Sequence, residues 1–369
     1  MIEQGKISSF QAAILLYMGV LSTSLLYLPS ITAAKAHNDF WMSPIFASVL
    51  GLLLVIVIYS LAKLYPNQTF MEYLPRIIGR IPALILGLLY LISLLNMDGA
   101  IVRSYTEFLL NAFISMTPKS IIIVTIIFVC AVTVRSGLEV IGRSAQFFTP
   151  FVILSLLFIV ILLQSSFDFK EIQPILANGL GPPIRGGFIV STWFSEFFFL
   201  AFLVPYTRDA SKSMKWAFIS VGAVLLTMVC MNLCILFMFG EDTGNYSYPI
   251  LIAARYISMS DFIENMEILI VVIWVVGLFV KISLFYYITA LCAAQWIGLS
   301  DYRPIVFPLG LLIFAFAVWG IPNLPALVAR SSKGTDNNDL MFRFVIPAAL
   351  LAVALLRSKF SAALRGGRS

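Results

Sequence analysis

Arg103, Glu107, Glu196 and Lys281 lie inside long apolar runs of this 369-residue sequence, where charge is most costly. Charge at membrane depth is costly, so such side chains face a bundle interior or a cavity and mark candidate functional sites. Arg103 and Glu107 are four residues apart and can pair on one helix face, which would also suit a structural lock. Glu196 must be protonated or paired with a base from another helix. Lys281 favours a functional role, and the alternatives are a structural pair with Glu196 or Glu107, or a side chain that extends to the membrane surface.

Hydroxyl side chains accompany these charges. Ser22, Thr23 and Ser24 interrupt the first apolar run, and Pro29 follows. They allow two structures: a helix break that lines a cavity, or a straight helix whose hydroxyls bond to its previous turn. The candidate ligand-binding residues are Ser22, Thr23, Ser24, Arg103, Glu107, Ser195, Glu196, Lys281 and Ser283.

The composition requires a membrane environment for these residues. The chain is 60% hydrophobic and 11% charged, whereas a soluble domain has about 45–50% apolar and about 25% charged residues. No nucleophile–base pair, metal-ligand set or phosphate loop is visible, so we expect neither an enzyme nor a cofactor. The four cysteines are interpreted as apolar filler, and no basic face for nucleic acid is present.

Ten apolar stretches approach or exceed the roughly 20 residues that a helix needs to cross a bilayer. The first is interpreted as a retained span, and the whole chain as one all-α transmembrane domain. The predicted spans are approximately 10–34, 41–64, 81–114, 119–141, 145–165, 186–206, 213–240, 263–297, 303–325 and 341–358.

The distribution of basic residues predicts the orientation of the chain. Fourteen of the 24 Lys and Arg residues lie on the side of the N-terminus, eight on the other side and two within spans. Basic residues are in excess on the cytoplasmic side of membrane proteins. We therefore expect both termini in the cytoplasm, as an even number of spans requires.

Ten spans also suggest two inverted repeats of five helices. Repeat one would cover about 10–165 and repeat two about 186–325, with 341–358 as its last span. Spans 1 and 6 take equivalent places, and both carry Ser/Thr clusters and end near a proline. Corresponding broken helices in two repeats indicate a binding site at the bilayer midplane. We therefore predict broken helices 1 and 6.

Several stretches in this order resemble the spore germination permease family, which comprises B-subunits of spore germinant receptors in the amino acid–polyamine–organocation superfamily. The loop motif at 172–186 is the most specific of them. The stretches are ISSFQ at 7–11, SLLYLPS at 24–30, HNDFWMSPI at 37–45, Arg103 with Glu107, TP at 117–118, SGLEVIGR at 136–143, IQPILANGLGPPIRG at 172–186, FSE at 194–196, YP at 248–249, and FIENME at 262–267 leading to Trp274.

The resemblance implies a pocket between spans 1 and 6 with walls from spans 3 and 8. It also implies location in the inner membrane of the spore, together with an A-subunit and a lipoprotein C-subunit. Ser22 and Ser24 stand where the family often has glycine, and Asn265 stands where an arginine is common. Lys281 is a further departure, and its ammonium would take the place of a coupling cation.

Three hypotheses describe the function. The first is a receptor subunit that binds a small nutrient, an amino acid or a sugar, and passes a conformational change to its partner subunits. The second is a proton-coupled amino acid transporter that works alone, with Glu196 and Lys281 as proton carriers. The third is a scaffold subunit of the receptor that binds no ligand.

Overall fold

The computed structural model describes residues 2–257, 267–321 and 337–366. Most of the FIENME stretch and the end of predicted span 303–325 lie outside this part, as do Arg330 and Lys333 of the charge count. The described chain is helical and contains no strand, only one isolated bridge between Ile7 and Thr207. The all-α prediction is confirmed.

The α-helices of the described chain differ widely in length, and short helical turns connect several of them. In chain order the α-helices are α1 (Ser9–Ala36), α2 (Ser43–Leu64), α3 (Phe70–Ile78), α4 (Arg80–Ala112), α5 (Lys119–Arg135), α6 (Leu138–Leu163), α7 (Gly181–Phe194), α8 (Leu200–Leu203), α9 (Ser213–Phe239), α10 (Pro249–Arg255), α11 (Glu267–Ile297), α12 (Val306–Trp319), α14 (Asn337–Leu340) and α15 (Ile346–Gly366). Three further helical turns matter below: the 3-10 helices η1 (His37–Met42) and η4 (Ser195–Phe199), and the π-helical turn η9 (Met341–Val345).

Seven segments of the described chain are long and apolar enough to cross a membrane, which makes this an integral membrane protein. One of them, Ser9–Leu64, contains both α1 and α2. At 17 and 14 residues, α5 and α12 are shorter apolar helices. The number of ten crossings therefore remains a prediction.

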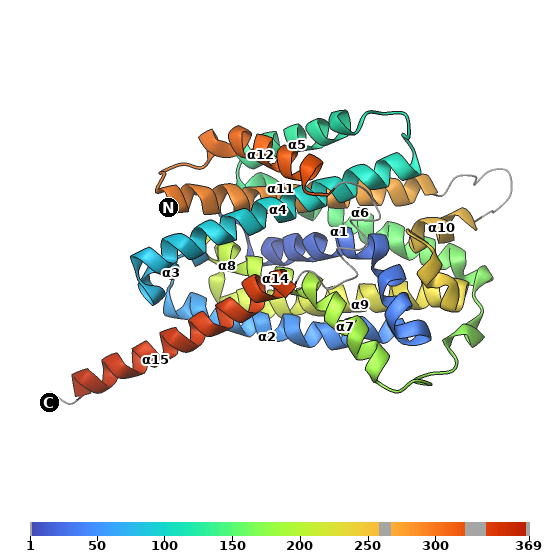
Figure 1. Ribbon diagram of the computed structural model, residues 1–369, viewed down its shortest axis with the longest axis horizontal. Coiled ribbons are helices and arrows are strands. Elements are labelled where there is room, and N and C mark those ends of the chain that lie inside the picture. The colour runs from blue at the N-terminus through green and yellow to red at the C-terminus, as the bar shows by residue number, and fades with distance from the viewer. Residues whose placement is uncertain (1, 258–266, 322–336, 367–369) are drawn as a thin grey trace.

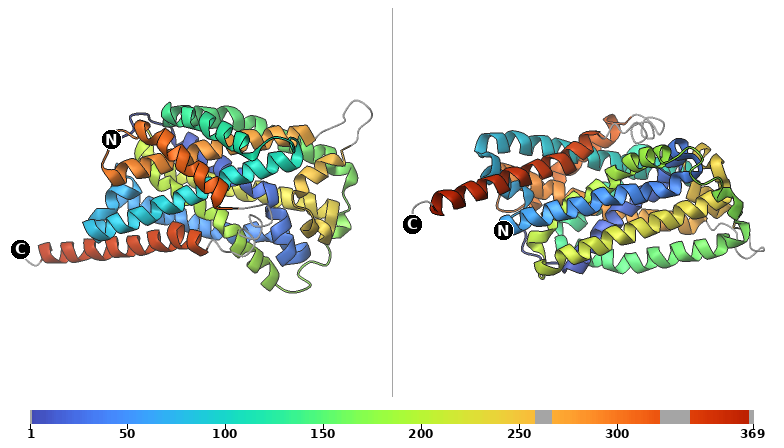
Figure 2. Two further views of the ribbon diagram at one scale, coloured as in Figure 1. Left: turned by 45° about the horizontal axis from the view of Figure 1, so that its top comes forward. Right: turned by 90° about the horizontal axis from the view of Figure 1, so that it is seen from below.

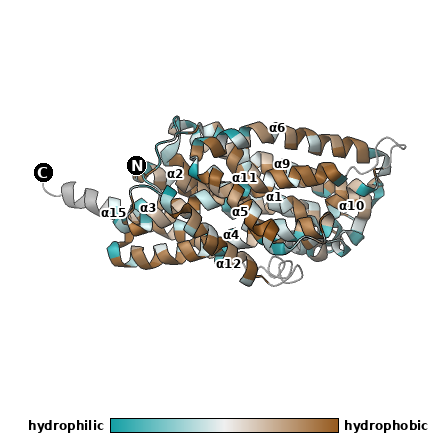
Figure 3. Cartoon of the chain, turned by 90° about the horizontal axis from the view of Figure 1, so that it is seen from above, coloured by the Kyte–Doolittle hydropathy of each residue, from teal (hydrophilic) through white to brown (hydrophobic). Residues whose placement is uncertain are grey.

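The long helices run roughly along one axis of the molecule, and α1 lies in the centre of the bundle (Figure 1). It packs against α6, α7, α9 and α11, while α4 packs against α11 and α12. The N-terminal segment and the far end of α15 lie at the same end of the bundle in every view (Figure 2). Apolar residues dominate the lengths of outer helices such as α6 and α12 (Figure 3).

The two predicted helix breaks have different outcomes. The break in span 1 is wrong, because α1 continues as an α-helix from Ser9 to Ala36. The Ser22 hydroxyl donates to the Met18 carbonyl and the Ser24 hydroxyl to the Leu21 carbonyl, so these side chains bond to the preceding turn without opening the helix. Span 6 is interrupted, since α7 ends at Phe194 and passes into η4.

The loop that contains the family-like motif at 172–186 is fastened to η1. Both carboxylate oxygens of Asp39 accept the Leu176 N–H, at 3.0 and 3.2 Å. The Asn38 side-chain amide donates to the Gln173 carbonyl at 3.2 Å. The HNDFWMSPI and IQPILANGLGPPIRG stretches thus contact each other, and together they cover one end of the bundle.

Candidate ligand-binding site

The centre of the candidate site is a buried ion pair between α11 and η4. Lys281 Nζ lies 2.8 Å from Glu196 Oε1 and 2.9 Å from Glu196 Oε2. It also donates to the Thr23 hydroxyl of α1 at 2.7 Å. The Lys281 and Glu196 side chains are only 1% and 6% exposed. Three elements that are far apart in sequence therefore meet at one ammonium group.

Hydroxyl groups near the end of α7 explain why Glu196 lies on a 3-10 turn. Ser191, Thr192 and Ser195 each donate their hydroxyl to the carbonyl three residues earlier, at 2.6–2.7 Å. Such bonds compete with the α-helical pattern, and 3-10 geometry is common where helices end or bend. The turn carries Glu196 from the end of α7 to the ammonium of Lys281.

Thr23 connects this turn to the central helix. Its Oγ1 accepts one hydrogen bond from Lys281 Nζ and a second from Trp193 Nε1, the latter at 3.1 Å. Trp193 lies three residues before Glu196, so Thr23 contacts span 6 directly through Trp193 and indirectly through Lys281. Sequence reasoning missed Trp193, and its nearness to Glu196 was the only available signal.

The ammonium of Lys281 is fully coordinated by protein groups. Its three N–H groups match three acceptor atoms, two from Glu196 and one from Thr23. It also lies 5.1 Å from the centre of the Phe285 ring, within range of a cation–π contact. A ligand that binds here must replace at least one of these partners.

Ser22 lies at the tight contact between α1 and α11. A Cβ placed on Gly277 would lie 2.8 Å from Ser22 Oγ, so a side chain at 277 would require the Ser22 hydroxyl to move. Among the predicted site residues, Ser22, Ser24 and Ser195 use their hydroxyls within their own helices. Their role in ligand binding stays a prediction.

Arg103 and Glu107 form a separate ionic group near the far end of α4. Arg103 Nη2 lies 2.8 Å from Glu107 Oε1, which confirms the predicted pair at spacing i,i+4. Lys119, at the start of α5, lies 3.1 Å from the same oxygen and is half exposed. The structure therefore arranges the predicted charges as two groups, since Arg103 and Glu107 pair with each other and with Lys119.

Ser283 is not part of the Lys281 contact. It follows Lys281 by two residues, which is roughly 200° around a helix with 3.6 residues per turn. Its side chain lies beside Cys130 of α5. The structure thus brings Thr23, Glu196 and Lys281 together and places Ser283 on another face of α11.

Arg343 is a charged residue near this site that sequence reasoning missed. The charge count placed it in an outer loop, but the residue is only 5% exposed and lies in the π-helical turn η9. Its Nη2 contacts Asp339 Oδ1 at 3.0 Å, and its guanidinium lies 5.6 Å from the centre of the Phe199 ring. It is close enough to act electrostatically on Glu196. Arg343 lies within span 341–358, which was the available signal.

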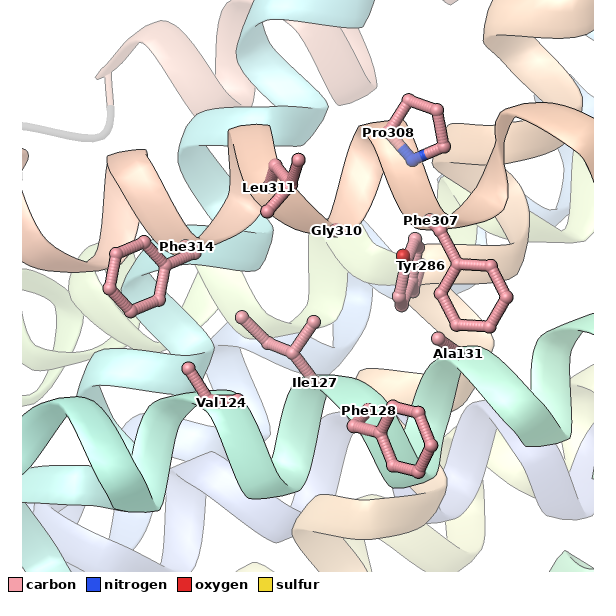
Figure 4. Close-up of a pocket in the computed structure, with 10 residues that line it drawn as sticks. All are labelled: Val124, Ile127, Phe128, Ala131, Tyr286, Phe307, Pro308, Gly310, Leu311 and Phe314. Atoms are coloured by element: carbon pink, nitrogen blue, oxygen red, sulfur yellow. The ribbon is translucent and has the colours of Figure 1, made fainter.

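A different cavity, of about 390 Å³, lies between α5 and α12 (Figure 4). It is lined by apolar side chains and by the Tyr286 ring, whose hydroxyl donates to the Val306 carbonyl. Phe128 and Leu311 on its wall are largely exposed, as lipid-facing residues are. With no charged lining residue, it does not resemble a site for a polar nutrient.

The described residues contain no group of three His, Cys, Asp or Glu side chains that suits a metal ion. Cys230 and Cys234 are free thiols on α9. The ammonium of Lys281 lies between α1, η4 and α11.

Comparison with protein families shows which family the chain belongs to. A model described as spore germination protein matches residues 6–323. The chain belongs to the spore germination protein family. Spore germination protein KB of Bacillus subtilis (strain 168) is 23% identical over 365 residues, which cover 97% of this chain and 96% of the relative. Spore germination protein YndE of the same organism is 25% identical, over 96% and 98%.

This member of the family shares its fold with solved transporters. MhsT in complex with L-phenylalanine has a TM-score of 0.65 at 12% identity, covering 96% of this chain and 99% of MhsT. A Na⁺-coupled sialic acid symporter in a substrate-bound outward-open state has a TM-score of 0.64 at 13% identity, covering 92% and 80%. At these identities the likeness shows the fold alone. Relatives and fold neighbours are thus germination proteins and transporters.

Proposed function

We propose that this protein is the membrane subunit of a spore germinant receptor that binds a small nutrient, an amino acid or a sugar. The observation that carries the proposal is the junction of Thr23, Glu196 and Lys281 between α1, η4 and α11. Membership of the spore germination protein family supports it. The proposal places the protein in the inner membrane of the spore with both termini in the cytoplasm. Its partners are an A-subunit and a lipoprotein C-subunit.

The proposed mechanism is an exchange of hydrogen-bond partners. Polar groups of the nutrient replace one of the bonds among Thr23, Glu196 and Lys281, and the three elements shift relative to each other. A ligand moves such an equilibrium only by binding one arrangement more tightly than the other. The shift then passes to the partner subunits through the surface of the bundle.

The two ionic groups have different roles in this proposal. Arg103 and Glu107 lie near the partly exposed Lys119, at the end of α4 from which the nutrient enters. Lys281 supplies, from within the chain, the positive charge that a bound cation supplies in a cation-coupled transporter. Binding would then need no added cation.

The test is nutrient-triggered germination of spores that carry Lys281→Met or Glu196→Gln at normal receptor levels. Both variants are expected to raise the nutrient concentration needed for germination. Lys215→Met is the control, since it removes an exposed lysine that lies outside both ionic groups, and it should leave the sensitivity unchanged. Unchanged sensitivity in both site variants would overturn the assignment.

A proton-coupled amino acid transporter that works alone is the second candidate. The fold is that of solved transporters, one of which is bound to L-phenylalanine. Uptake by the purified protein in liposomes, driven by a pH gradient, would favour this candidate. The absence of uptake by protein that still binds the nutrient would favour the receptor.

A scaffold subunit that binds no ligand is the third candidate. All three donors of Lys281 have partners within the protein, and the hydroxyls of Ser22 and Ser24 bond to their own helix. Direct binding of a nutrient to the isolated subunit would exclude this candidate.

A further inference from the structure

Asp98 is a buried carboxyl group that the proposed site does not use. It lies near the middle of α4 and is 1% exposed. Its Oδ2 accepts one hydrogen bond, from the Thr289 hydroxyl of α11, at 2.6 Å. No ion pair involves Asp98 in the described part of the chain.

Other buried carboxyl groups of the described chain have stronger partners. Glu196 pairs with Lys281, and Glu107 pairs with Arg103 and Lys119. Those in the polar segments outside the bundle core accept backbone N–H groups instead. Glu3 accepts from the Gly5 and Leu138 backbone and also from the Tyr302 hydroxyl, and Asp39 accepts from the Leu176 backbone. Asp98 has a single neutral hydroxyl.

The surroundings of Asp98 do not supply a free cation. Besides Thr289, the titratable groups that face it are Tyr286 of α11, Cys130 of α5 and Arg343 of η9. Arg343 is within electrostatic range, but its guanidinium contacts Asp339 at 3.0 Å. On the α12 side, Gly99, the residue after Asp98, packs tightly against the Phe316 side chain and the backbone of Phe316 and Ala317, which brings no charged group.

The charges around this point do not balance if every group is ionised. Lys281 and Arg343 carry two positive charges, while Glu196, Asp339 and Asp98 carry three negative charges. An unpaired buried charge costs far more than one hydrogen bond returns, and a carboxyl group avoids that cost by taking up a proton. Lys281 and Arg343 already have carboxylate partners, so Asp98 is the group left over.

We propose that Asp98 is a proton-binding site of this protein, occupied at neutral pH and separate from the Lys281–Glu196 pair. Because the carboxyl group lies between α4 and α11, the proton stays bound while these helices are packed together. Separation of the two helices admits water, lowers the cost of the charge and releases the proton. Movement of α4 against α11 is thereby coupled to one proton, whichever ligand the protein binds.

The test is infrared spectroscopy of the full-length protein in lipid vesicles. At neutral pH the wild type is expected to show the carbonyl stretch of a protonated carboxyl group, shifted in heavy water. Asp98→Asn should remove the intensity of one carboxyl group. Asp242→Asn is the matched control, because that residue is exposed to solvent, and it should leave the band unchanged.

A second variant keeps the test decisive if Asp98→Asn does not fold. Thr289→Val removes the hydroxyl that bonds Asp98, so the band should move to higher frequency without losing intensity. A wild-type spectrum at neutral pH without a protonated carboxyl band would overturn the proposal. A band that neither Asp98→Asn nor Thr289→Val changes would also overturn it.

Discussion

The Arg103–Glu107 and Lys281–Glu196 pairs differ in how they are built. Arg103 and Glu107 lie on the same helix at spacing i,i+4, and the half-exposed Lys119 adds a second cation. Lys281 and Glu196 come from different elements, 85 residues apart in sequence, and share Thr23 of a third. The first pair is local, and the second depends on the packing of α1, η4 and α11.

This difference suggests different tasks. In the local group, Glu107 has two cationic partners and keeps one of them when the other is removed. This group should therefore tolerate the loss of one contact, for example to a polar molecule. The central pair has one cation, which holds three elements together. In the proposed receptor, a ligand that competes for that cation would change the packing of these three elements.

The largest effect is expected for Lys281→Met. It leaves the Glu196 carboxyl group buried without its cation, and loss of one partner of a buried pair costs about 3–5 kcal/mol. The measurement is thermal unfolding of the purified protein in lipid. The double variant Lys281→Met with Glu196→Gln should recover most of this loss, because no buried charge then lacks a partner. A double variant as unstable as Lys281→Met would contradict this explanation.

Thr23→Val is expected to have a smaller effect. It removes the oxygen that accepts from both Lys281 and Trp193, and a buried donor without an acceptor costs about 1–3 kcal/mol. Thr23→Ser keeps the oxygen and serves as the control in the same unfolding measurement. If Thr23→Val and Thr23→Ser were equally stable, the Thr23 hydroxyl would not hold α1 to the Lys281–Glu196 pair.

Lys119→Met should change stability by less than about 1 kcal/mol, since half-exposed ion pairs contribute little. Glu107 keeps Arg103 as its partner in this variant. Unfolding of Lys119→Met beside Lys281→Met compares the two groups directly. If both variants lost the same free energy of unfolding, the two ionic groups would not differ in their contribution to stability.

The smallest effect is expected from the titration of Asp209, which lies outside the membrane-spanning segments. The Ser9 backbone N–H donates to Asp209 at 2.7 Å and holds the pKa of that carboxyl group below its usual range. Its stabilising contribution is therefore present above the pKa of an unfolded aspartate, about 3.9, and is lost as the pH falls through the lower folded value.

Asp209→Asn should remove this part of the acid dependence, measured as the protection of the start of α1 from amide hydrogen exchange at several pH values. An identical pH profile in wild type and Asp209→Asn would show that Asp209 does not stabilise the N-terminal segment.

Part of the candidate site could be predicted from the sequence for two reasons. Some interactions are local, and a charge inside an apolar run is conspicuous because of the free energy that its burial costs. The pair of Arg103 and Glu107 follows from helical periodicity, and the structure contains this pair. Glu196 and Lys281 are conspicuous in sequence because charge inside an apolar run is costly. Their partnership was one of the open alternatives, since sequence distance carries no information on which helices touch.

The failures have a common physical origin. The hydroxyls of Ser22 and Ser24 suit a break or a continuous helix equally well, and packing of α1 among its neighbours selects the continuous one. Arg343 lies near the end of an apolar run, where an arginine can reach water or turn inward. The π-helical turn and the Phe199 ring place it inside.

By itself, the sequence determined the class of this protein, an all-α membrane protein of the spore germination protein family, and the few charges inside its apolar runs that make up the candidate site. Composition and helical spacing are properties of the chain alone, so they can be read without coordinates. Only the tertiary structure decided that Lys281 pairs with Glu196 through Thr23 and that Asp98 meets Thr289. These contacts join elements far apart in the chain, and the packing of the whole bundle sets which of them form.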